Sequence, residues 1–400
     1  MKNQLNLIIA LIIFVFAGCN STRKIGETIK SRGSGIDASL APPEIIFNPE
    51  NPKYKDENRR WQGIPSIEIT ENGTLWIVFY SGGTRESNEN YVIVVRSNDK
   101  GKTWSDIQMV IEHPDSVRTF DPCIWKDPQN NLWITWVQSY GLYDGRCGVW
   151  AIKTANPDDK LPTWTKPERI ANGIMMNKPT FLSTGEWLLS CAIWKDEKPD
   201  IIQDVSYENE KSSNVYSSID NGLTFKLKGG ADVPDRHYDE HKVIEKKDGS
   251  LWMLVRTHYG IGESYSHDGG KNWTPGEPTA LGGPCSRFHI SRLASGNLLL
   301  VNHYQNTGRN RLAAMISKDD GKSWEGHLMI DERNAVSYPN ATQDADGTIC
   351  IVYDRERNGD GAKEILMATV TEEDILAGKC ISKIGKLKTI VNKAGKNNQN

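Results

Sequence analysis

The 400-residue sequence lacks the clustered basic residues typical of nucleic-acid-binding proteins and the paired cysteines typical of zinc sites. Its formal net charge is −3 and it contains no block of basic residues, which argues against a nucleic-acid partner. Its seven cysteines form no Cys-x-x-Cys pair, so their spacing indicates no zinc site, and we expect no cofactor. Cys123, Cys191 and Cys350 lie in apolar segments, where buried thiols and an occasional disulfide are both compatible with the sequence.

The sequence has no long apolar segment near its start, only a short one. The apolar run from Leu5 to Phe16 is too short to span a bilayer and is followed by Ala17, Gly18 and Cys19. This arrangement resembles a bacterial lipobox, although an ordinary signal peptide with an incidental cysteine is the alternative. We therefore predict a signal peptide over residues 1–18, lipidation of Cys19 and a polar tether over residues 19–40. The predicted location is the bacterial cell envelope, with the lipid anchor facing the periplasm or in the outer membrane.

No long amphipathic helical pattern competes with strand signals such as the alternation over residues 91–95. Instead, an apolar strand, a Gly or Asn turn and a second strand with a large apolar residue near its start recur six times. The turns lie at Gly73, Asn131, Gly185, Gly249, Gly296 and Gly347. A period of roughly 50 residues built from short strands is typical of propeller blades. We predict an all-β fold, a six-bladed β-propeller over residues 41–385, with a Lys-rich tail over residues 386–400; two stacked β-domains are the alternative.

A second motif, S-x-D-x-G-x-[TNS]-[WF], occurs at residues 97–104, 218–225, 266–273 and 317–324. Its Ser and Asp side chains can satisfy turn amides, its Gly supplies a backbone angle that other residues resist, and its aromatic residue folds back as a plug. This is the Asp-box hairpin, and its repetition resembles the sialidase (neuraminidase) family. That resemblance also implies a six-bladed propeller. Because the Asp box is a structural motif, function has to be argued from other residues.

The innermost strand of each propeller blade begins at the central axis, so the residues that open these strands should converge on one face. They are rich in charged, aromatic and imidazole groups, whereas the strands that follow are apolar. A polar ring at one end of apolar strands indicates a site. The predicted ring consists of residues 60–62, 120–121, 177–178, 239–241, 287–289 and 337–340.

Several of these residues match sialidase features. Tyr338 resembles the family's tyrosine nucleophile, Glu240 its glutamate partner, and Arg256 and Arg309 its second and third arginines. A neutral tyrosine suits a substrate whose own carboxylate would repel an acidic nucleophile, and a neighbouring glutamate can take its proton. Arginine binds a carboxylate in bidentate fashion. Arg287, Arg60, Gln62, Asp121, Asn177 and Lys178 are further predicted substrate-binding residues.

Two departures from the family pattern stand out. The family opens its first blade with Arg-Ile-Pro, where this chain has Gly63-Ile64-Pro65, so the first arginine of the carboxylate-binding triad is missing. Arg60, Arg287 and Lys178 are the candidates to replace it. The loop that should carry the family's aspartate acid/base offers Glu86 and Glu89 instead.

Two histidines suggest a different chemistry. His241 and His289 are predicted near the axis, where arginine could neutralise a uronic acid and histidine or tyrosine could remove its C5 proton. The resulting β-elimination would make the protein a lyase or a dehydratase. We therefore predict a lipid-anchored enzyme acting at acidic nonulosonic or uronic sugar termini of glycans. A sialidase-like exo-glycosidase is the main hypothesis, elimination on a uronic acid the second, and a non-catalytic glycan-binding lipoprotein the third.

Overall fold

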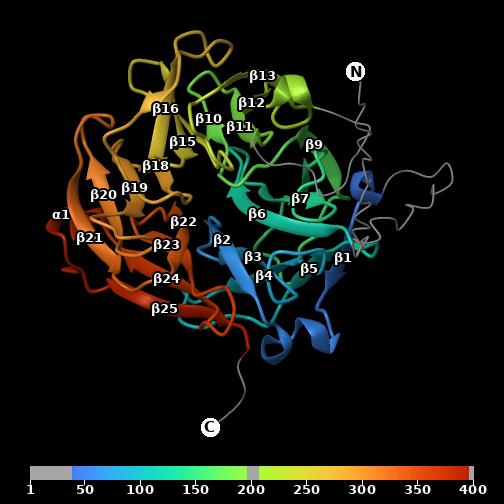
Figure 1. The fold of residues 1–400 in the computed structure, drawn as a ribbon. Coiled ribbons are helices and arrows are strands. Elements are labelled where there is room, and N and C mark those ends of the chain that lie inside the picture. The colour runs from blue at the N-terminus through green and yellow to red at the C-terminus, as the bar shows by residue number, and fades with distance from the viewer. Residues whose placement is uncertain (1–37, 196–206, 396–400) are drawn as a thin grey trace, which may run out of the picture. The chain divides into compact units, whose positions relative to one another are not determined.

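A computed structural model describes residues 38–195 and 207–395. Its strands form six separate antiparallel sheets, which Figure 1 shows arranged around a common centre. The prediction of an all-β, six-bladed propeller is therefore confirmed. The described residues contain one α-helix, α1 (Glu372–Ala377), and four short 3-10 helices, which are η1 (Ala38–Leu40), η2 (Pro52–Tyr54), η3 (Asp56–Asn58) and η4 (Glu208–Glu210).

The first three blades follow one another along the chain. Blade one contains β2 (Gln62–Ile69), β3 (Leu75–Ser81), β4 (Tyr91–Ser97) and β5 (Met109–Glu112), with β1 (Glu44–Phe47) added beside β5. Blade two contains β6 (Arg118–Lys126), β7 (Leu132–Ser139), β8 (Gly148–Thr154) and β9 (Glu168–Asn172). Blade three contains β10 (Thr180–Phe181), β11 (Trp187–Ala192), β12 (Ser213–Ser218) and β13 (Lys226–Ala231).

The other three blades repeat this order. Blade four contains β14 (Lys242–Glu245), β15 (Leu251–Thr257), β16 (Gly260–Ser266) and β17 (Glu277–Pro278). Blade five contains β18 (His289–Arg292), β19 (Leu298–His303), β20 (Leu312–Ser317) and β21 (Glu325–Asp331). Blade six contains β22 (Val336–Gln343), β23 (Ile349–Arg355), β24 (Glu364–Val370) and β25 (Lys386–Lys393). The ring closes where β2 of blade one lies beside β22 of blade six (Figure 1).

The end of the chain differs from the prediction. β25 pairs antiparallel with β24 as the outer strand of blade six, so the propeller extends past the predicted boundary at residue 385. The predicted signal peptide, the lipidation site Cys19 and most of the predicted tether lie outside the described residues. In the part of the chain that the structure describes, no helix is both long and apolar enough to span a membrane.

The core lies between neighbouring blades. The middle strands are buried on both faces because each blade packs against the next, as in β3, whose seven residues are all buried. Between blades two and three, the indole ring of Trp125 stacks on that of Trp133 at a centroid distance of 4.8 Å and meets Trp187 edge-on at 5.9 Å. Burial of such large aromatic surfaces stabilises the ring of blades.

The six recurring turns join the first strand to the second in every blade, as the repeat predicted. In the turn of blade two, the residue with positive φ is Asn130, which directly precedes the predicted turn residue Asn131. The four Asp boxes join the third strand to the fourth in blades one, three, four and five. In the box of blade four, Asp268 Oδ1 accepts hydrogen bonds from the amides of Lys271 and Asn272, and Ser266 Oγ accepts one from Gly270. The Asp-box aspartate is therefore engaged within its own turn.

Candidate active site

Three innermost strands carry the same local irregularity. Ile64 in β2, Asp121 in β6 and Tyr338 in β22 have φ values of 56°, 47° and 54°. Each precedes a proline and lies where the strand register shifts, which marks a β-bulge. Such a backbone conformation before proline costs on the order of 1–3 kcal/mol and is typical of functional sites. The three bulges turn these side chains into one pocket.

All six blades contribute to this pocket, which has a volume of about 130 Å³. It contains four arginines, three carboxylic acids and several aromatic rings. Its lining residues are Ile64, Tyr80, Glu86, Arg118, Phe120, Asp121, Leu142, Met176, Trp194, Tyr238, Glu240, Arg256, Arg309, Tyr338 and Arg357. The excess of guanidinium over carboxyl groups favours an anionic ligand.

Tyr338, Glu240 and Arg256 are in direct contact inside the pocket. The Tyr338 hydroxyl lies 3.2 Å from Glu240 Oε1, and Arg256 Nη1 donates to Glu240 Oε1 at 2.6 Å and to the Tyr338 hydroxyl at 3.2 Å. All three residues are buried. Burial and the charge of Glu240 raise the pKa of Tyr338, so the tyrosine is a neutral phenol at neutral pH. Among the residues that the structure describes, the second carboxylate oxygen of Glu240 has no hydrogen-bond partner, and it can accept a proton.

The loop that carries Glu240 is held in an unusual conformation. Tyr238, Asp239 and Glu240 have successive φ values of 58°, 51° and 43°. Asn177 Nδ2 donates to the backbone carbonyls of Glu240 and His241 at 2.8 and 3.0 Å, which fixes the loop from blade three. Asn177, predicted to bind substrate, therefore positions the glutamate.

The two further carboxyl groups of the pocket differ in protonation. Burial, together with the nearby charge of Glu86, raises the pKa of Asp121 to about 7. Although burial acts in the opposite direction, Arg118, Arg357 and a hydrogen bond from Tyr80 lower the pKa of Glu86. Asp121 is thus the carboxyl group that can carry a proton near neutral pH, whereas Glu86 is ionised. Glu89 is exposed and is not among the lining residues.

Three guanidinium groups surround the ring of Tyr338. Arg357, Arg309 and Arg287 lie 4.5, 5.1 and 5.4 Å from its centroid. Arg309 also donates to the carbonyl of Cys285 at 3.0 Å. The two Nη groups of Arg287 donate to the carbonyls of Met176, Pro65 and Tyr338, so this residue ties four blades together.

The position of the missing first-blade arginine is filled from blade six. A Cβ atom on Gly63 would lie 2.7 Å from Arg357 Cδ and 2.9 Å from Asp354 Oδ2. The Arg357 side chain thus occupies the space that a residue-63 side chain would need, and glycine at this position makes room for it. Arg357 is anchored by Ser337 Oγ at 3.0 Å and by Asp354.

Several predicted residues lie elsewhere. Arg60 is exposed, and the amide of Gln62 donates to the carbonyl of Lys363. Lys178 pairs with Glu68 at 2.8 Å and lines a separate cavity of about 280 Å³. Neither Lys178 nor Arg60 is among the residues that line the arginine-rich pocket.

The two histidines are also outside the pocket. His241 is buried and its Nε2 lies 2.7 Å from the carbonyl of Asn214. His289 lines the separate cavity, with its Nε2 2.9 Å from Ser291 Oγ. Burial lowers the pKa of both, and for His289 the charges of Lys178, Lys242 and Arg287 add to the effect. Both imidazoles are therefore neutral and engaged away from Tyr338.

The sequence interpretation missed three lining residues that bear on the chemistry, namely Tyr80, Arg118 and Arg357. Arg118 opens β6 three residues before Asp121, so its place at the start of an inner strand was a usable signal. Arg357 follows β23 and reaches the pocket from the far end of that strand. Nothing in the local sequence marks it.

The fold and the pocket define a class: a six-bladed Asp-box propeller with a tyrosine, glutamate and arginine site at the ends of its inner strands. Residues 73–351 match the BNR repeat-like domain family. The chain belongs to this family, and its resemblance to sialidases is confirmed.

Relatives of known activity support the same grouping. The chain is 28% identical to a sialidase of Clostridium perfringens over 293 residues, which are 65% of this chain and 74% of the relative. It is 25% identical to a sialidase of Bacteroides fragilis (strain YCH46) over 337 residues, 75% of this chain but 61% of the relative. The structure of the Hadza microbial sialidase Hz136 superposes with a TM-score of 0.62 at 18% identity, covering 79% of this chain and 66% of that one. The last comparison establishes the fold alone.

Proposed function

We propose that this chain is a glycoside hydrolase of the sialidase type that releases a terminal acidic sugar from a glycan. The contact between the Tyr338 hydroxyl, Glu240 and Arg256 is the observation that carries this proposal. A phenol beside a carboxylate with an unpartnered oxygen is an arrangement that activates tyrosine as a nucleophile. The sialidases among the relatives support a hydrolase of this type.

In the proposed reaction, Tyr338 Oη attacks the anomeric carbon while Glu240 accepts the phenol proton. Asp121, protonated because its pKa is raised to about 7, gives its proton to the departing glycosidic oxygen. A water molecule that Asp121 deprotonates then attacks the anomeric carbon of the glycosyl–tyrosine intermediate. The bond to Tyr338 breaks, and Glu240 returns its proton to the departing tyrosine oxygen. Two successive displacements at one carbon retain its configuration.

The substrate's carboxylate is proposed to bind Arg256, Arg309 and Arg357. The first two match the second and third arginines of the family pattern, and Arg357 replaces the first from another blade. Arginine forks bind a carboxylate in bidentate fashion, and their positive charge stabilises it in a pocket of limited water access. A carboxylate next to the reacting carbon also explains why the nucleophile is neutral.

Elimination from a uronic acid is less well supported. It requires a base near the C5 proton. Both histidines predicted for that task lie outside the pocket, and of the predicted bases Tyr338 alone lies in it. We therefore expect Glu240→Gln to reduce turnover by at least about a hundredfold and His289→Ala to change it little. The reverse order would support elimination.

Product analysis separates the candidate functions. The protein is incubated separately with sialosides and with uronate-ended oligosaccharides, while reducing ends and the ultraviolet absorbance of unsaturated uronates are followed. New reducing ends without absorbance support hydrolysis. Absorbance would show elimination, and the absence of both products would favour a glycan-binding module.

We also propose that the protein is secreted and anchored to the cell envelope through Cys19. The motif of residues 17–19 supports this proposal. Cys19→Ser should shift the protein from the membrane fraction to the soluble fraction of its host. Unchanged partition would contradict the anchor without affecting the proposed chemistry.

A further inference from the structure

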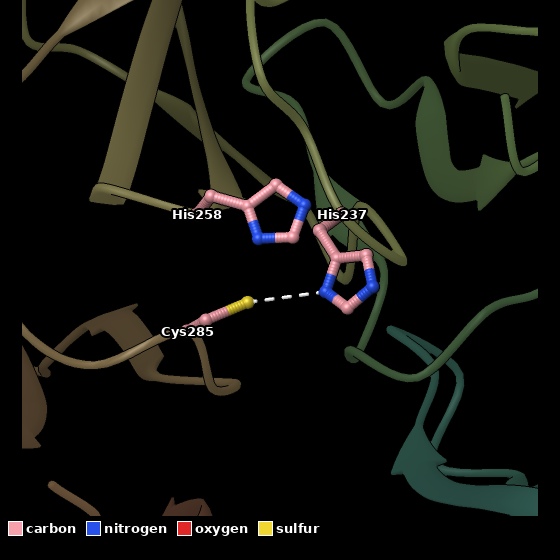
Figure 2. Close-up of side chains that lie close together, drawn as sticks. All are labelled: His237, His258 and Cys285. Atoms are coloured by element: carbon pink, nitrogen blue, oxygen red, sulfur yellow. Dashed lines mark hydrogen bonds between the residues drawn. The ribbon is translucent and has the colours of Figure 1, made fainter. Parts of the chain in front are cut away.

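Two histidines and a cysteine converge beside the proposed active site, from three different loops. His237 lies between β13 and β14, His258 between β15 and β16, and Cys285 between β17 and β18. Their ligand atoms all lie within 4.8 Å of one another. Figure 2 shows the three side chains turned toward one another, with the thiol of Cys285 directed at the ring of His237.

We propose that His237, His258 and Cys285 bind a borderline or soft transition metal ion of the Zn²⁺ type. Imidazole nitrogen and thiolate sulfur are the donors that such ions prefer. Zinc bond lengths with tetrahedral angles place nitrogen and sulfur ligands about 3.6 Å apart. His237 Nδ1 and Cys285 Sγ are 3.2 Å apart, which is close to this separation.

The backbone holds the two histidines in fixed relative positions. Arg236 and Thr257, the residues just before them, form an antiparallel β-bridge. The amide of His237 donates to the carbonyl of Arg256 at 3.1 Å, and that of His258 donates to Asp235 at 2.9 Å. The two imidazole rings stack at a centroid distance of 4.3 Å. A modest rotation of side chains on this rigid frame completes a three-ligand set.

The site is accessible and electrostatically suitable. His258 is exposed, while His237 and Cys285 are half-buried, so an ion can enter from solvent. One thiolate and two neutral imidazoles supply a single negative charge, which leaves a dication with an open position for water. Arg256 Nε donates to Cys285 Sγ at 3.2 Å, and Arg256 itself is neutralised by Glu240. Such hydrogen bonds to a metal-bound thiolate are common outer contacts of metal sites.

The position of the cluster indicates its role. His237 immediately precedes the residues 238–240 with positive φ, which carry Glu240. Cys285 contacts Arg256 through its sulfur and Arg309 through its carbonyl. A bound ion would fasten together the three loops that position Glu240, Arg256 and Arg309. This structural role of the metal ion does not depend on which glycan the enzyme cleaves.

Zinc binding to the full chain tests the proposal. Metal-stripped protein without a polyhistidine tag is dialysed against micromolar Zn²⁺, and bound zinc is measured per chain. We expect one equivalent for the parent protein and at least tenfold weaker binding for His258→Ala and Cys285→Ser. Cys380→Ser and His267→Ala, which change an exposed cysteine and an exposed histidine elsewhere, should bind as the parent does.

Cobalt(II) adds a readout that reports ligation by sulfur. The parent and both control variants should show thiolate-to-cobalt charge-transfer absorption, which Cys285→Ser should lack. Less than half an equivalent of zinc on the parent chain would overturn the proposal, as would tight binding that survives His258→Ala and Cys285→Ser. Because His258 is exposed, its variant should fold normally, so that comparison holds even if Cys285→Ser is unstable.

Discussion

At the scale of single residues, the pocket holds three carboxyl groups in different states, and the proposed mechanism uses two of them, Glu240 and Asp121. Glu240 contacts the nucleophile, Glu86 is ionised among arginines, and Asp121 holds a proton near neutral pH. A raised pKa means that the protonated form is present below about pH 7 and is lost as the pH rises. The acid needed for the first step is therefore depleted in alkaline solution.

The first prediction concerns this pH dependence. For substrates with a poor leaving group, kcat/KM should fall as pH rises through about 7, because the group titrated in the free enzyme is Asp121. Asp121→Asn should remove that alkaline limb and lower kcat by about 10²- to 10⁴-fold. The pH profiles of both proteins check this result.

A substrate whose leaving group needs no proton provides the control. Its kcat/KM, which reports the first step, should fall far less in Asp121→Asn, because that step then needs no acid. Its kcat should still fall, because Asp121 is also the base of the second step. An unchanged alkaline limb in this variant would assign the titration to another group.

The second prediction tests the arginine that comes from blade six. Arg357→Ala should raise KM for a carboxylate substrate by at least about tenfold, because a charge-assisted hydrogen bond contributes roughly 1.5–3 kcal/mol. Gly63→Arg in the same background should recover part of the loss, since truncation of residue 357 removes the nearest atom that a side chain at position 63 would meet. The Asp354 carboxylate, which no longer pairs with Arg357, must then shift slightly. Gly63→Arg alone should be harmful, because Arg357 occupies that space. Steady-state kinetics of the three variants decide the matter, and a double variant no better than Arg357→Ala would refute the replacement.

Part of this site could be predicted from sequence and part could not. Tyr338, Glu240 and Arg256 can be predicted because each matches a residue of the sialidase pattern and lies at or near a predicted inner strand. Arg357 could not be predicted in this way. It takes the place of a blade-one side chain only because blades one and six are neighbours in the closed ring, which the sequence does not show. Arg287 and Lys178 show the opposite error: they lie at the predicted strand openings, but their side chains serve backbone carbonyls and Glu68.

At the scale of elements, hairpins were the most predictable features, since their turn residues satisfy local hydrogen bonds. The outer strand β25 was missed because Lys386, Lys388 and Lys393 make it resemble a solvated tail. Lysines are common on edge strands, where they discourage pairing with other chains. Leu387, Ile390 and Val391 are the apolar residues of this segment that indicate a strand, and they stand among the lysines.

The third prediction concerns the Asp box of blade four. Asp268→Ala should lower Tm by about 2 °C or more, because the amides of Lys271 and Asn272 lose their acceptor, while turnover per folded molecule is kept. Asp268→Asn retains one acceptor oxygen, so its Tm should lie between those of the parent protein and Asp268→Ala. Thermal unfolding and kinetics are measured on the same samples. A large loss of turnover at unchanged Tm would mean that the motif acts in function.

At the scale of the whole molecule, the first and last blades of the described chain are neighbours, but neither takes a strand from the other. Each blade consists of strands that are consecutive in the chain, with β1 added to blade one. Contacts between blades, including those of Arg287 with the carbonyls of Pro65, Met176 and Tyr338, hold the ring together. The pocket, which residues of all six blades line, therefore depends on the packing between neighbouring blades.

The fourth prediction follows from this closure. Deleting residues 386–400 removes β25, exposes β24 and takes away the buried Val391, so Tm should fall by roughly 5 °C or more. Deleting residues 396–400 leaves every described strand intact and should have little effect. Thermal unfolding of the two truncated proteins tests the boundary. Equal Tm values would show that β25 contributes nothing to the fold.

The central claim is that Tyr338 forms a covalent bond to the sugar during hydrolysis. Mass spectrometry of a reaction quenched in the steady state, followed by peptide mapping, tests it most directly. We predict one glycosyl group on Tyr338, and none on Tyr338→Phe, which should also lose at least about a thousandfold in turnover. Tyr353→Phe, which loses a hydroxyl bonded to Asp331 outside the pocket, should still form the adduct. Rapid turnover with unmodified Tyr338, together with full activity of Tyr338→Phe, would contradict the account.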